Sequence, residues 1–358
     1  MFVADAAPGA VQAQTGKLAL KRVTENGQAA TQPADSQPPP ARPPTPARPV
    51  AAEFGASKRP ATPTPPRDGV QPGRLSGRLL AVARQAALDH AGFSPGLIDG
   101  AIGPKTRLAL RTFQQARGLP ATGEFDEASD AALSVHERPA TIEYVVTSRD
   151  LASVGPVPTD WNAKSRLSRL DYESLEALLA ERGHCTRAEL ARLNPGRSFT
   201  SLVAGDRILL PNVGREESPA SSAAAVEVDL SARTVRAIDG QGRTLALFHC
   251  SIAKYASKRP KGDAVVRKIA WDPEYTFDPK MWPEVRSVKT KLTIPPGPRN
   301  PVGLCWIGLS LPGYGIHGTP APELIGKTGS HGCIRLANWD VLRLAKMIKV
   351  DTRVRFVD

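Results

Sequence analysis

Apolar and polar residues follow two different periods along this chain, helical near its start and strand-like near its end. In residues 75–135 the first apolar positions recur at roughly helical spacing, as Leu79, Val82, Ala86 and Leu88. Such spacing predicts a buried helical face. Because proline is favoured in the first turn of a helix, a second helix is expected near Pro104. A third, short helix is expected near Asp126, so residues 73–136 predict a small all-α domain.

Short runs of alternating apolar and polar residues occur within residues 222–358. Residues 226–230 alternate, and the turn sequence of residues 239–242, Asp-Gly-Gln-Gly, separates them from a second alternating run. A period of two with a glycine-containing turn predicts a β-hairpin. Residues 339–347 return to helical spacing, and residues 353–357 alternate again. We therefore expect a mainly-β domain with one late helix.

Residues 141–213 have a mixed pattern. Residues 142–146 alternate like a strand, residues 172–180 are typical of a helix, and a second helix is expected to end at Pro195. Residues 203–212 contain a turn followed by a strand-like run. The order strand, helix, helix, strand predicts a small α+β domain.

Proline is unevenly distributed along the chain. Many of the 34 prolines stand between residues 28 and 70, where large apolar residues are almost absent. Such a segment buries too little apolar surface to offset the entropy lost on ordering. Residues 1–72 are therefore expected to be a disordered, semi-stiff spacer ahead of three domains in a multidomain chain.

The formal net charge of +12 raises the question of nucleic-acid binding. A nucleic-acid-binding surface combines a basic stripe with interleaved aromatic residues or a recognition helix. Here lysine and arginine are scattered over every segment, and aromatic residues make up only 5% of the chain. The composition argues against a nucleic-acid partner and suits the anionic surfaces of a cell envelope.

Two further patterns bear on location. No run of eighteen apolar residues occurs, so no transmembrane helix is expected. Residues 1–6, Met-Phe-Val-Ala-Asp-Ala, lack the basic start and long apolar stretch of a secretory signal.

The chain has four cysteines, Cys185, Cys250, Cys305 and Cys333, too few for a disulfide scaffold. Cys250 and Cys305 are expected to be small apolar residues on strands, and a disulfide between them is left open. No Cys-x-x-Cys spacing occurs, so neither a metal nor another cofactor is expected.

The candidate chemistry lies in two short segments, His317-Gly318-Thr319 and Ser330-His331-Gly332-Cys333-Ile334-Arg335. A thiol needs a base or a cation to become the reactive thiolate. His317 is a candidate base, and Gly332 permits a tight turn that exposes the Cys333 sulfur. The amides of Gly332 and Cys333 are candidates for stabilising an oxyanion, and one such donor is worth about 3 kcal/mol of barrier. These residues predict acyl transfer through a thioester.

Two other interpretations of Cys333 exist. An isolated cysteine is usually buried in a core, and His331 together with Cys333 are possible zinc ligands. A polar, glycine-containing turn is poor material for a core, and the other cysteines stand in unrelated contexts. The nucleophile is therefore the favoured interpretation.

The ordered set of motifs around this cysteine resembles the L,D-transpeptidases, which cross-link peptidoglycan. The matching segments are residues 294–303, 306–309, 313–319 and 330–335, within residues 224–358. The resemblance implies that family's mainly-β fold and its covalent mechanism. Cys333 would attack the carbonyl of the third residue in a donor tetrapeptide stem, the terminal D-alanine would leave, and an amine of a neighbouring stem would resolve the thioester.

The resemblance also implies roles for the neighbouring residues. His317 would take the thiol proton, with its ring oriented by a backbone carbonyl, that of Gly318. The amides of Gly332 and Cys333 would stabilise the oxyanion. The remaining implied roles are turn shaping by Ser330 and His331, binding of a stem carboxylate or support of the oxyanion by Arg335, and lining or support of the cleft by Tyr314 and Trp306.

Two upstream segments resemble wall-binding modules. Residues 96–123, beginning Gly-Leu-Ile-Asp-Gly, are similar to the peptidoglycan-binding three-helix domain. Residues 141–213, with Leu-Asn-Pro at residues 193–195, are similar to the lysin-motif fold, which binds amino-sugar chains, although the stretch between residues 146 and 172 is longer than usual.

The expected function is that of a peptidoglycan L,D-transpeptidase that forms 3→3 cross-links or attaches a protein to stem peptides. An L,D-carboxypeptidase and a non-catalytic wall-binding protein are the alternatives. We expect a carbapenem-sensitive monomer in the periplasm or cell envelope, with peptidoglycan as its partner. We also expect a resting thiolate held by His317, and upstream modules that leave the reactivity of the thiol unchanged.

Overall fold

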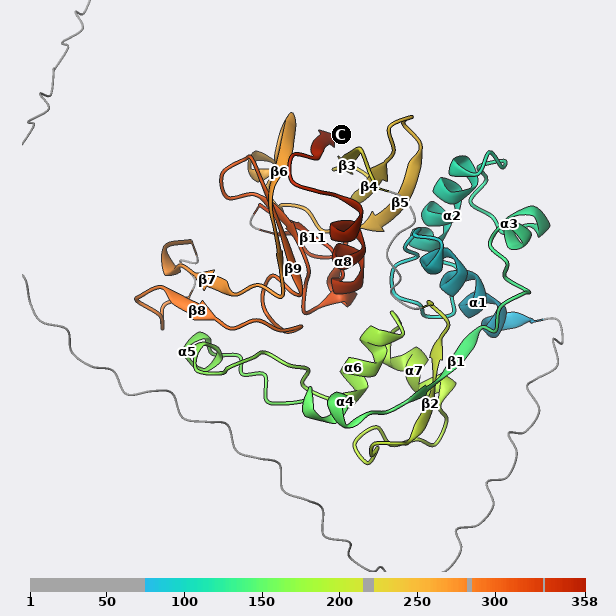
Figure 1. Ribbon diagram of the computed structural model, residues 1–358, viewed down its shortest axis with the longest axis horizontal. Helices are drawn as coiled ribbons and strands as arrows, with labels where there is room; N and C mark the ends of the chain where they lie inside the picture. The colour runs from blue at the N-terminus through green and yellow to red at the C-terminus, as the bar shows by residue number, and fades with distance from the viewer. Residues whose placement is uncertain (1–74, 215–221, 282–284, 331) are drawn as a thin grey trace, which may run out of the picture. The chain divides into compact units, whose positions relative to one another are not determined.

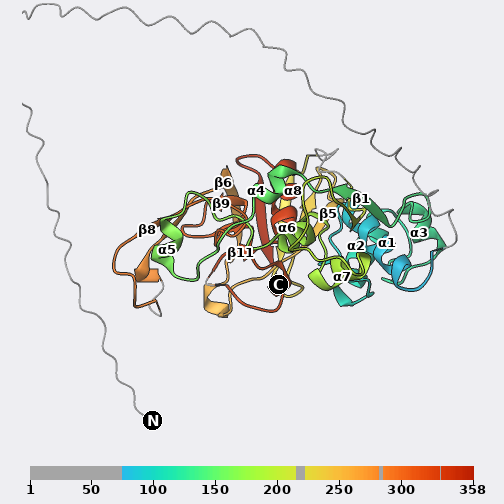
Figure 2. The same cartoon turned by 90° about the horizontal axis from the view of Figure 1, so that it is seen from below.

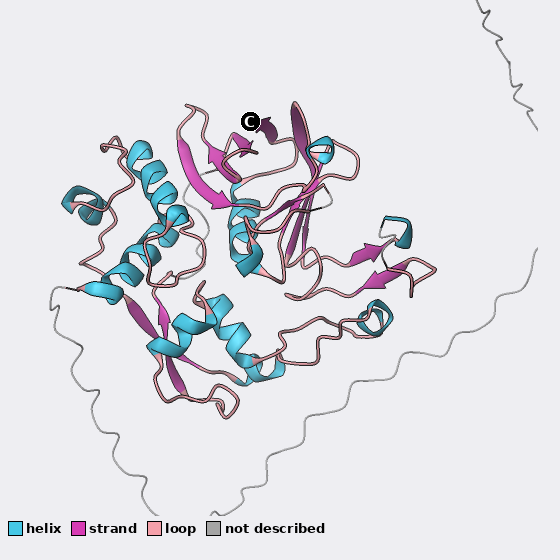
Figure 3. Cartoon of the chain, turned by 180° about the vertical axis from the view of Figure 1, so that it is seen from behind, coloured by secondary structure: helices cyan, strands magenta, loops and turns pink. Residues whose placement is uncertain are grey.

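Most of the α-helices in the described part of the chain lie in its first half, and most of the strands lie in its second half. Figure 3 distinguishes the helices from the strands by colour. The structure, a computed structural model, describes residues 75–214, 222–281, 285–330 and 332–358. The spacer expected for residues 1–72 therefore lies outside the described residues. The described residues all belong to one compact unit.

Three helices form the region that the spacing predicts to be all-α: α1 (Gly77–His90), α2 (Pro104–Ala116) and α3 (Glu127–Ala132) (Figure 1). Pro104 is the first residue of α2, and the Asp126 carboxylate caps α3 by accepting from the Ser129 amide at 2.8 Å. Both expected helix starts are confirmed. In the core beneath them, the Phe93 and Phe113 rings meet edge to face with centroids 5.4 Å apart.

Helix α1 contributes to two cores at once. Ala83 and Leu88 lie in the core of the helical region, whereas Val82 and Ala86 lie in the core of the segment that follows it. The sequence predicts one apolar face for this helix, but its apolar side chains are divided between two hydrophobic cores.

The segment that follows is built on two antiparallel strands, β1 (Thr141–Val145) and β2 (Arg207–Pro211). Four helices lie between them in the chain: α4 (Ser148–Ala152), α5 (Trp161–Ser165), α6 (Leu175–Arg182) and α7 (Arg187–Leu193). The predicted order of strand, helix, helix and strand corresponds to β1, α6, α7 and β2. Helices α4 and α5 fill the long stretch between residues 146 and 172 and were not predicted.

The rest of the chain is built on an eight-stranded mixed sheet with the strand order β11-β10-β9-β6-β12-β3-β4-β5. Its strands are β3 (Ala225–Asp229), β4 (Thr234–Ile238), β5 (Thr244–His249), β6 (Asp263–Trp271), β9 (Cys305–Leu309), β10 (Gly315–His317), β11 (Ile334–Arg335) and β12 (Arg353–Val357). The pairs β10–β11 and β12–β3 are parallel, and the others are antiparallel. Helix α8 (Asn338–Met347) lies beside β9 (Figure 1). The expected strand-rich region with one late helix is confirmed.

Short elements complete this region. Strands β7 (Tyr275–Phe277) and β8 (Leu292–Ile294) form a separate antiparallel pair. Three single-turn 3-10 helices are η1 (Ala256–Lys258), η2 (Pro279–Met281) and η3 (Pro322–Leu324).

Strand β5 ends the large sheet, and the helical region covers its open edge. The Ser94 amide donates to the Leu247 carbonyl at 2.8 Å, and the Leu247 amide donates to the Gly92 carbonyl at 3.0 Å. Gly92 and Ser94 thus satisfy the outward-facing amide and carbonyl of Leu247. On an exposed edge strand these groups would be free to pair with another chain.

The unpredicted stretch that contains α5 packs on the β7–β8 pair, and α5 lies beside β8 in both Figure 1 and Figure 2. The Leu170 amide donates to the Pro296 carbonyl at 2.8 Å, and the Leu170 carbonyl accepts from the Arg299 amide at 3.0 Å. The Trp161 and Phe277 rings stack with centroids 4.2 Å apart. The additional residues between 146 and 172 therefore form contacts with the strand-rich region.

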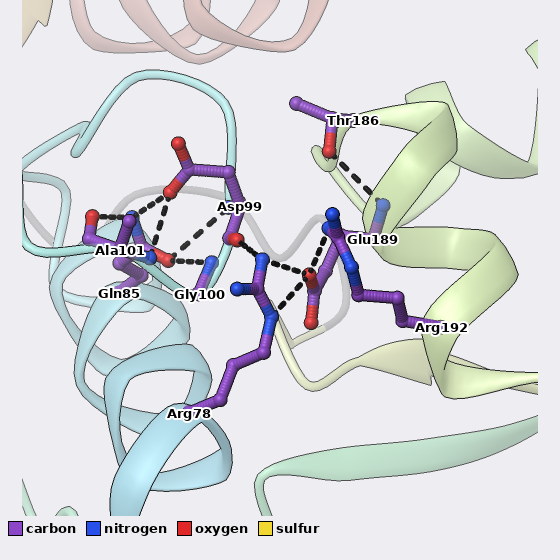
Figure 4. A network of polar contacts seen from close by, with 8 residues as sticks. All are labelled: Arg78, Gln85, Asp99, Gly100, Ala101, Thr186, Glu189 and Arg192. Carbon is purple, nitrogen blue, oxygen red and sulfur yellow. Dashed lines mark hydrogen bonds and ion pairs between the residues drawn. The ribbon is translucent and has the colours of Figure 1, made fainter.

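A polar network joins the helical region to α7 (Figure 4). The Arg78 guanidinium donates through Nε to Glu189 at 2.9 Å and also contacts the Asp99 carbonyl. On the same side, the Gln85 side chain holds the turn at Asp99 and Gly100, accepting from the Gly100 amide at 2.8 Å. Glu189 is buried, so the ion pair with Arg78 compensates a carboxylate that water cannot reach.

Residues from three parts of the chain meet in a second buried polar cluster. Asp89 at the end of α1 contacts His184 Nδ1 at 3.0 Å, and Arg343 on α8 lies 3.8 Å from the same carboxylate. Asp340 on α8 accepts from the Ser94 hydroxyl at 3.1 Å. Burial, followed by the nearby charge of Asp89, raises the pKa of Asp340 to about 7.

All four cysteines are free thiols, so Cys250 and Cys305 are not paired, and both are buried, as expected for small apolar residues of strands. Within the described ranges, no cluster of three or more His, Cys, Asp and Glu side chains is placed to hold a metal ion. None of the helices in the described part of the chain combines the length and apolar character needed to cross a membrane.

Candidate active site

Two short neighbouring strands position the candidate base and nucleophile. Strand β10 ends at His317 and pairs in parallel with β11, with His317 opposite Arg335. Cys333 directly precedes β11. The pairing therefore brings the end of β10, which carries the candidate base, next to the start of β11, which directly follows the candidate nucleophile.

The His317 ring is held on two sides. Its Nδ1 donates to the Gly318 carbonyl at 2.7 Å, the contact expected from the sequence. Trp306, its register partner on β9, stacks on the ring with centroids 5.4 Å apart and planes 21° apart. Because a carbonyl can only accept, the proton of the neutral ring is on Nδ1, and Nε2 is left as the proton acceptor.

Burial also sets the charge of the base. The His317 side chain belongs to a residue that is only 6% exposed, and burial lowers its pKa to about 4. The hydrogen bond to Gly318 opposes this shift, and the positive charge of Arg335 adds to it. The imidazole is therefore neutral near pH 7, which is the state that a general base requires.

Cys333 is half-buried, and its Sγ donates to the Gly313 carbonyl at 3.6 Å. Burial raises the pKa of the Cys333 thiol, while a hydrogen bond from the Gly315 backbone and the charge of Arg335 oppose the shift. The resting pair is a neutral thiol and a neutral imidazole. The expected resting thiolate is therefore wrong, because removal of water destabilises the anion more than the nearby charge stabilises it.

The turn before Cys333 is closed by Ser330. The Ser330 hydroxyl donates to the Cys333 carbonyl at 2.5 Å and accepts from the Gly332 amide at 3.2 Å. Ser330 thus shapes the turn, as expected from the sequence. The Gly332 amide is occupied by this contact, whereas the Cys333 amide makes no hydrogen bond among the described contacts. His331 lies outside the described residues.

Arg335 and Tyr314 stand on either side of this turn. Arg335 donates through Nη2 to the Gly329 carbonyl, and its buried Nε has no partner in the described part of the chain. Burial lowers the pKa of Arg335. The Tyr314 hydroxyl donates to the Lys258 carbonyl at 3.1 Å, and a Cβ on Gly332 would lie 3.5 Å from the Tyr314 ring. Tyr314 therefore packs over the turn, in accord with a lining role.

Asn338, at the start of α8, is a structural support of the site that the sequence did not indicate. Its Oδ1 accepts from the Leu304 amide at 3.1 Å, and its Nδ2 donates to Glu181 at 2.9 Å. A Cβ on Gly318 would lie 2.3 Å from Asn338 Oδ1, and one on Gly303 would lie 2.1 Å from it. Both glycines are therefore required by close approach to this side chain.

Arg299 is a second support that had no assigned role. It is 9% exposed and donates to Glu173 at 2.6 Å, to Glu181 at 3.0 Å and to the Pro320 carbonyl at 3.2 Å. The two glutamates come from the region of α6, and Pro320 lies three residues after His317. Arg299 thus connects the loop that follows His317 to the region of α6.

Comparisons with known proteins identify the family of the chain. A family model described as an L,D-transpeptidase catalytic domain matches residues 223–356, and one described as a peptidoglycan binding domain matches residues 82–133. The protein named as the L,D-transpeptidase YkuD of Bacillus licheniformis is 31% identical over 182 residues, which cover 51% of this chain and 92% of that one. The chain belongs to the L,D-transpeptidase family.

Two further L,D-transpeptidases match different shares of the chain. The Escherichia coli protein YbiS, also named as an L,D-transpeptidase, is 44% identical over 98 residues, which cover 26% of this chain and 31% of that one. A crystal structure of an L,D-transpeptidase from Xylanimonas cellulosilytica is 18% identical and covers 77% of this chain and 92% of that one, with a TM-score of 0.31. Neither family model covers residues 134–222, so the lysin-motif resemblance of residues 141–213 stays a prediction.

Proposed function

We propose that this chain catalyses L,D-transpeptidation of peptidoglycan stems, forming 3→3 cross-links or joining a protein to a stem. The observation that carries the proposal is the His317 ring, whose Nδ1 is fixed on the Gly318 carbonyl at 2.7 Å and whose Nε2 burial keeps unprotonated. A neutral base at the end of β10 and a thiol directly before the adjacent strand β11 support acyl transfer through a thioester. Family membership and the peptidoglycan binding domain support the wall polymer as substrate and the cell envelope as location.

In the acylation step, Cys333 Sγ attacks the carbonyl carbon of the third stem residue while His317 Nε2 accepts the thiol proton. We assign the resulting oxyanion to the Cys333 amide, because the Gly332 amide already donates to Ser330 at 3.2 Å. One such donor lowers the barrier by about 3 kcal/mol. The peptide C–N bond then breaks, and His317 returns the proton to the departing amine of D-alanine.

In the second step, an amine of a neighbouring stem attacks the thioester carbonyl. His317 accepts a proton from this amine and passes it to the sulfur as the C–S bond breaks, which restores the free thiol and leaves a new amide. We assign Arg335 to a stem carboxylate, since its buried Nε lacks a partner in the described residues and an arginine fork matches a carboxylate. Water in place of the amine would give L,D-carboxypeptidation instead.

The test is to incubate the purified full chain with muropeptides that carry tetrapeptide stems and to identify the products by mass spectrometry. Dimers of the 3→3 type support transpeptidation. Tripeptides without dimers assign the chain as a carboxypeptidase and overturn the proposal. Unchanged muropeptides together with tight binding to sacculi would make it a wall-binding protein.

A further inference from the structure

A basic pocket of about 540 Å³ lies next to the candidate catalytic turn. Four cationic side chains line it, those of Arg233, Lys254, Arg259 and Lys327, and no acidic residue does. The remaining wall comes from residues 251–253 and from Thr328 and Gly329. The pocket is therefore a concave surface of a single charge sign.

The four cations have no counter-charge of their own. Among the described residues, none of them forms an ion pair with a carboxylate. Arg233 donates to the Gly326 carbonyl at 2.6 Å and Arg259 to the Ala253 carbonyl at 3.4 Å. These backbone contacts orient the guanidinium groups without neutralising them. Like charges in one hollow repel each other and attract an anion from solution.

The pocket and the catalytic turn share one backbone. The Ser330 amide donates to the Ile252 carbonyl at 2.8 Å, and the Ser330 carbonyl accepts from the Lys254 amide at 3.0 Å. A Cβ on Gly329 would lie 2.5 Å from Lys254 Cβ, so only glycine permits this approach. Ser330 also holds the Cys333 carbonyl at 2.5 Å. An anion bound in the pocket would therefore lie against the backbone of Ser330, whose hydroxyl contacts Cys333.

We propose that this pocket is a subsite for carboxylates of the donor stem, distinct from the contact assigned to Arg335. The proposal rests on the proposed function and adds the part of the substrate that the pocket takes. Stem peptides carry free carboxylates, which match both the arginine forks and the lysine charges. The acceptor stem brings a protonated amine beside its carboxylates, and four cations would repel that amine. We therefore assign the pocket to the donor.

The pocket is tested with the full chain by the substitution pair Lys254→Gln and Lys327→Gln, two exposed side chains. The probes are a soluble tetrapeptide stem with free carboxylates and the same stem with its side-chain and α-carboxylates amidated. For the free stem, the double substitution should raise KM for acylation roughly tenfold and leave kcat unchanged, the loss expected when two charge contacts are removed. For the amidated stem, it should change neither constant.

The matched control is the pair Lys349→Gln and Arg353→Gln, which removes two positive charges from exposed positions that do not line this pocket. This control should leave both constants unchanged for both stems. An equal rise in KM with the control pair would show a general effect of net charge and would overturn the subsite. No change with Lys254→Gln and Lys327→Gln, or an equal change for both stems, would overturn it too.

A second arm separates the subsite from the proposed function. Calorimetric titration of Cys333→Ala with the two stems measures binding without any reaction. The free stem should bind more tightly than the amidated one, and addition of the two lysine substitutions should weaken binding of the free stem roughly tenfold while leaving that of the amidated stem unchanged. If wild-type protein forms no acyl adduct on Cys333, the proposed function fails, while this titration still decides whether the pocket binds carboxylates.

Discussion

Glu181 on α6 and Asn338 on α8 are joined by a hydrogen bond of 2.9 Å although 157 positions separate them in the chain. Through Asn338 this contact reaches the backbone at Leu304 and the Gly318 turn behind the base. Glu181 also accepts from Arg299, which holds the loop after His317. The support of the base therefore extends outside the strand-rich region. A chain that begins near residue 218 should lose reactivity with a soluble donor, the reverse of the sequence-based prediction.

Glu181→Ala should lower the free energy of unfolding by roughly 3 kcal/mol, because it leaves the buried Arg299 short of one carboxylate. Urea unfolding measures this change, and the rate of acylation should fall with it as the loop after His317 loosens. Glu176→Ala on the same helix is the control. Its ion pair with Arg187 is exposed at 3.9 Å, so its loss should cost less than about 1 kcal/mol. Equal costs for the two substitutions would contradict the bracing role.

A carbapenem should form one covalent adduct with the full chain, on Cys333. The strained amide of the drug presents a carbonyl to the thiol, and its oxygen can accept from the Cys333 amide. Cys250 and Cys305 are fully buried, and burial raises the pKa of Cys305 to about 12, so neither should react. Intact-mass and peptide mass spectrometry locate the adduct. Cys333→Ala should abolish it together with all turnover, and an adduct on Ser330 would reassign the nucleophile.

The rate of acylation should rise with pH through the pKa of His317, about 4, and then stay level through neutral pH. Neutral His317 is the form that accepts the proton, and the raised pKa of Cys333 keeps the thiol protonated over that range. Single-turnover kinetics with a soluble donor give the profile. A rate that climbs steadily from neutral to alkaline pH would instead indicate a pre-formed thiolate. His317→Ala should lower the rate by roughly two to four decades and remove the acid limb.

Asp340 should make the protein less stable as pH rises from acid toward neutral. Its pKa is raised from 3.8 to about 7 in the folded chain, so the folded state binds a proton that the unfolded state releases. The stabilisation from this proton is fully present below pH 3.8, the pKa of the unfolded state, and is lost as the pH rises to about 7, the pKa of the folded state. Between these values the free energy of unfolding falls by at most about 1.4 kcal/mol per pH unit. Urea unfolding at several pH values should show a flatter profile for Asp340→Asn. Identical slopes for the two proteins would refute the assignment.

Local patterns predicted the elements well where one face of an element meets one core. Residues 226–230 alternate because Val226 and Val228 enter the core of the sheet, and they form β3 as expected. Helix α2 begins at Pro104 because the ring and the missing amide suit a first turn. The hydrogen bond from His317 to the Gly318 carbonyl is the one that the family resemblance implied, and a neutral imidazole base needs such an acceptor on its other nitrogen.

Contacts between distant segments were not predictable in the same way. Helix α5 has five residues and packs on β8, so no helical period is long enough to detect. Asn338 and Arg299 gain their roles from Glu181, and nothing in either local sequence points to that partner. The charge state of Cys333 was mispredicted for a related reason, because burial decides it and burial depends on the whole turn.

The cover of strand β5 has a consequence for how the chain is made. Synthesis delivers α1 and the Gly92–Ser94 loop long before Leu247, the partner of both loop backbone contacts. At usual translation speeds the interval is about ten to thirty seconds. During that time the backbone groups of Gly92 and Ser94 lack their partner Leu247, and the surface of the helical region that packs on β5 is exposed to solvent. Ribosome-bound intermediates should therefore bind chaperones at this region until β5 emerges.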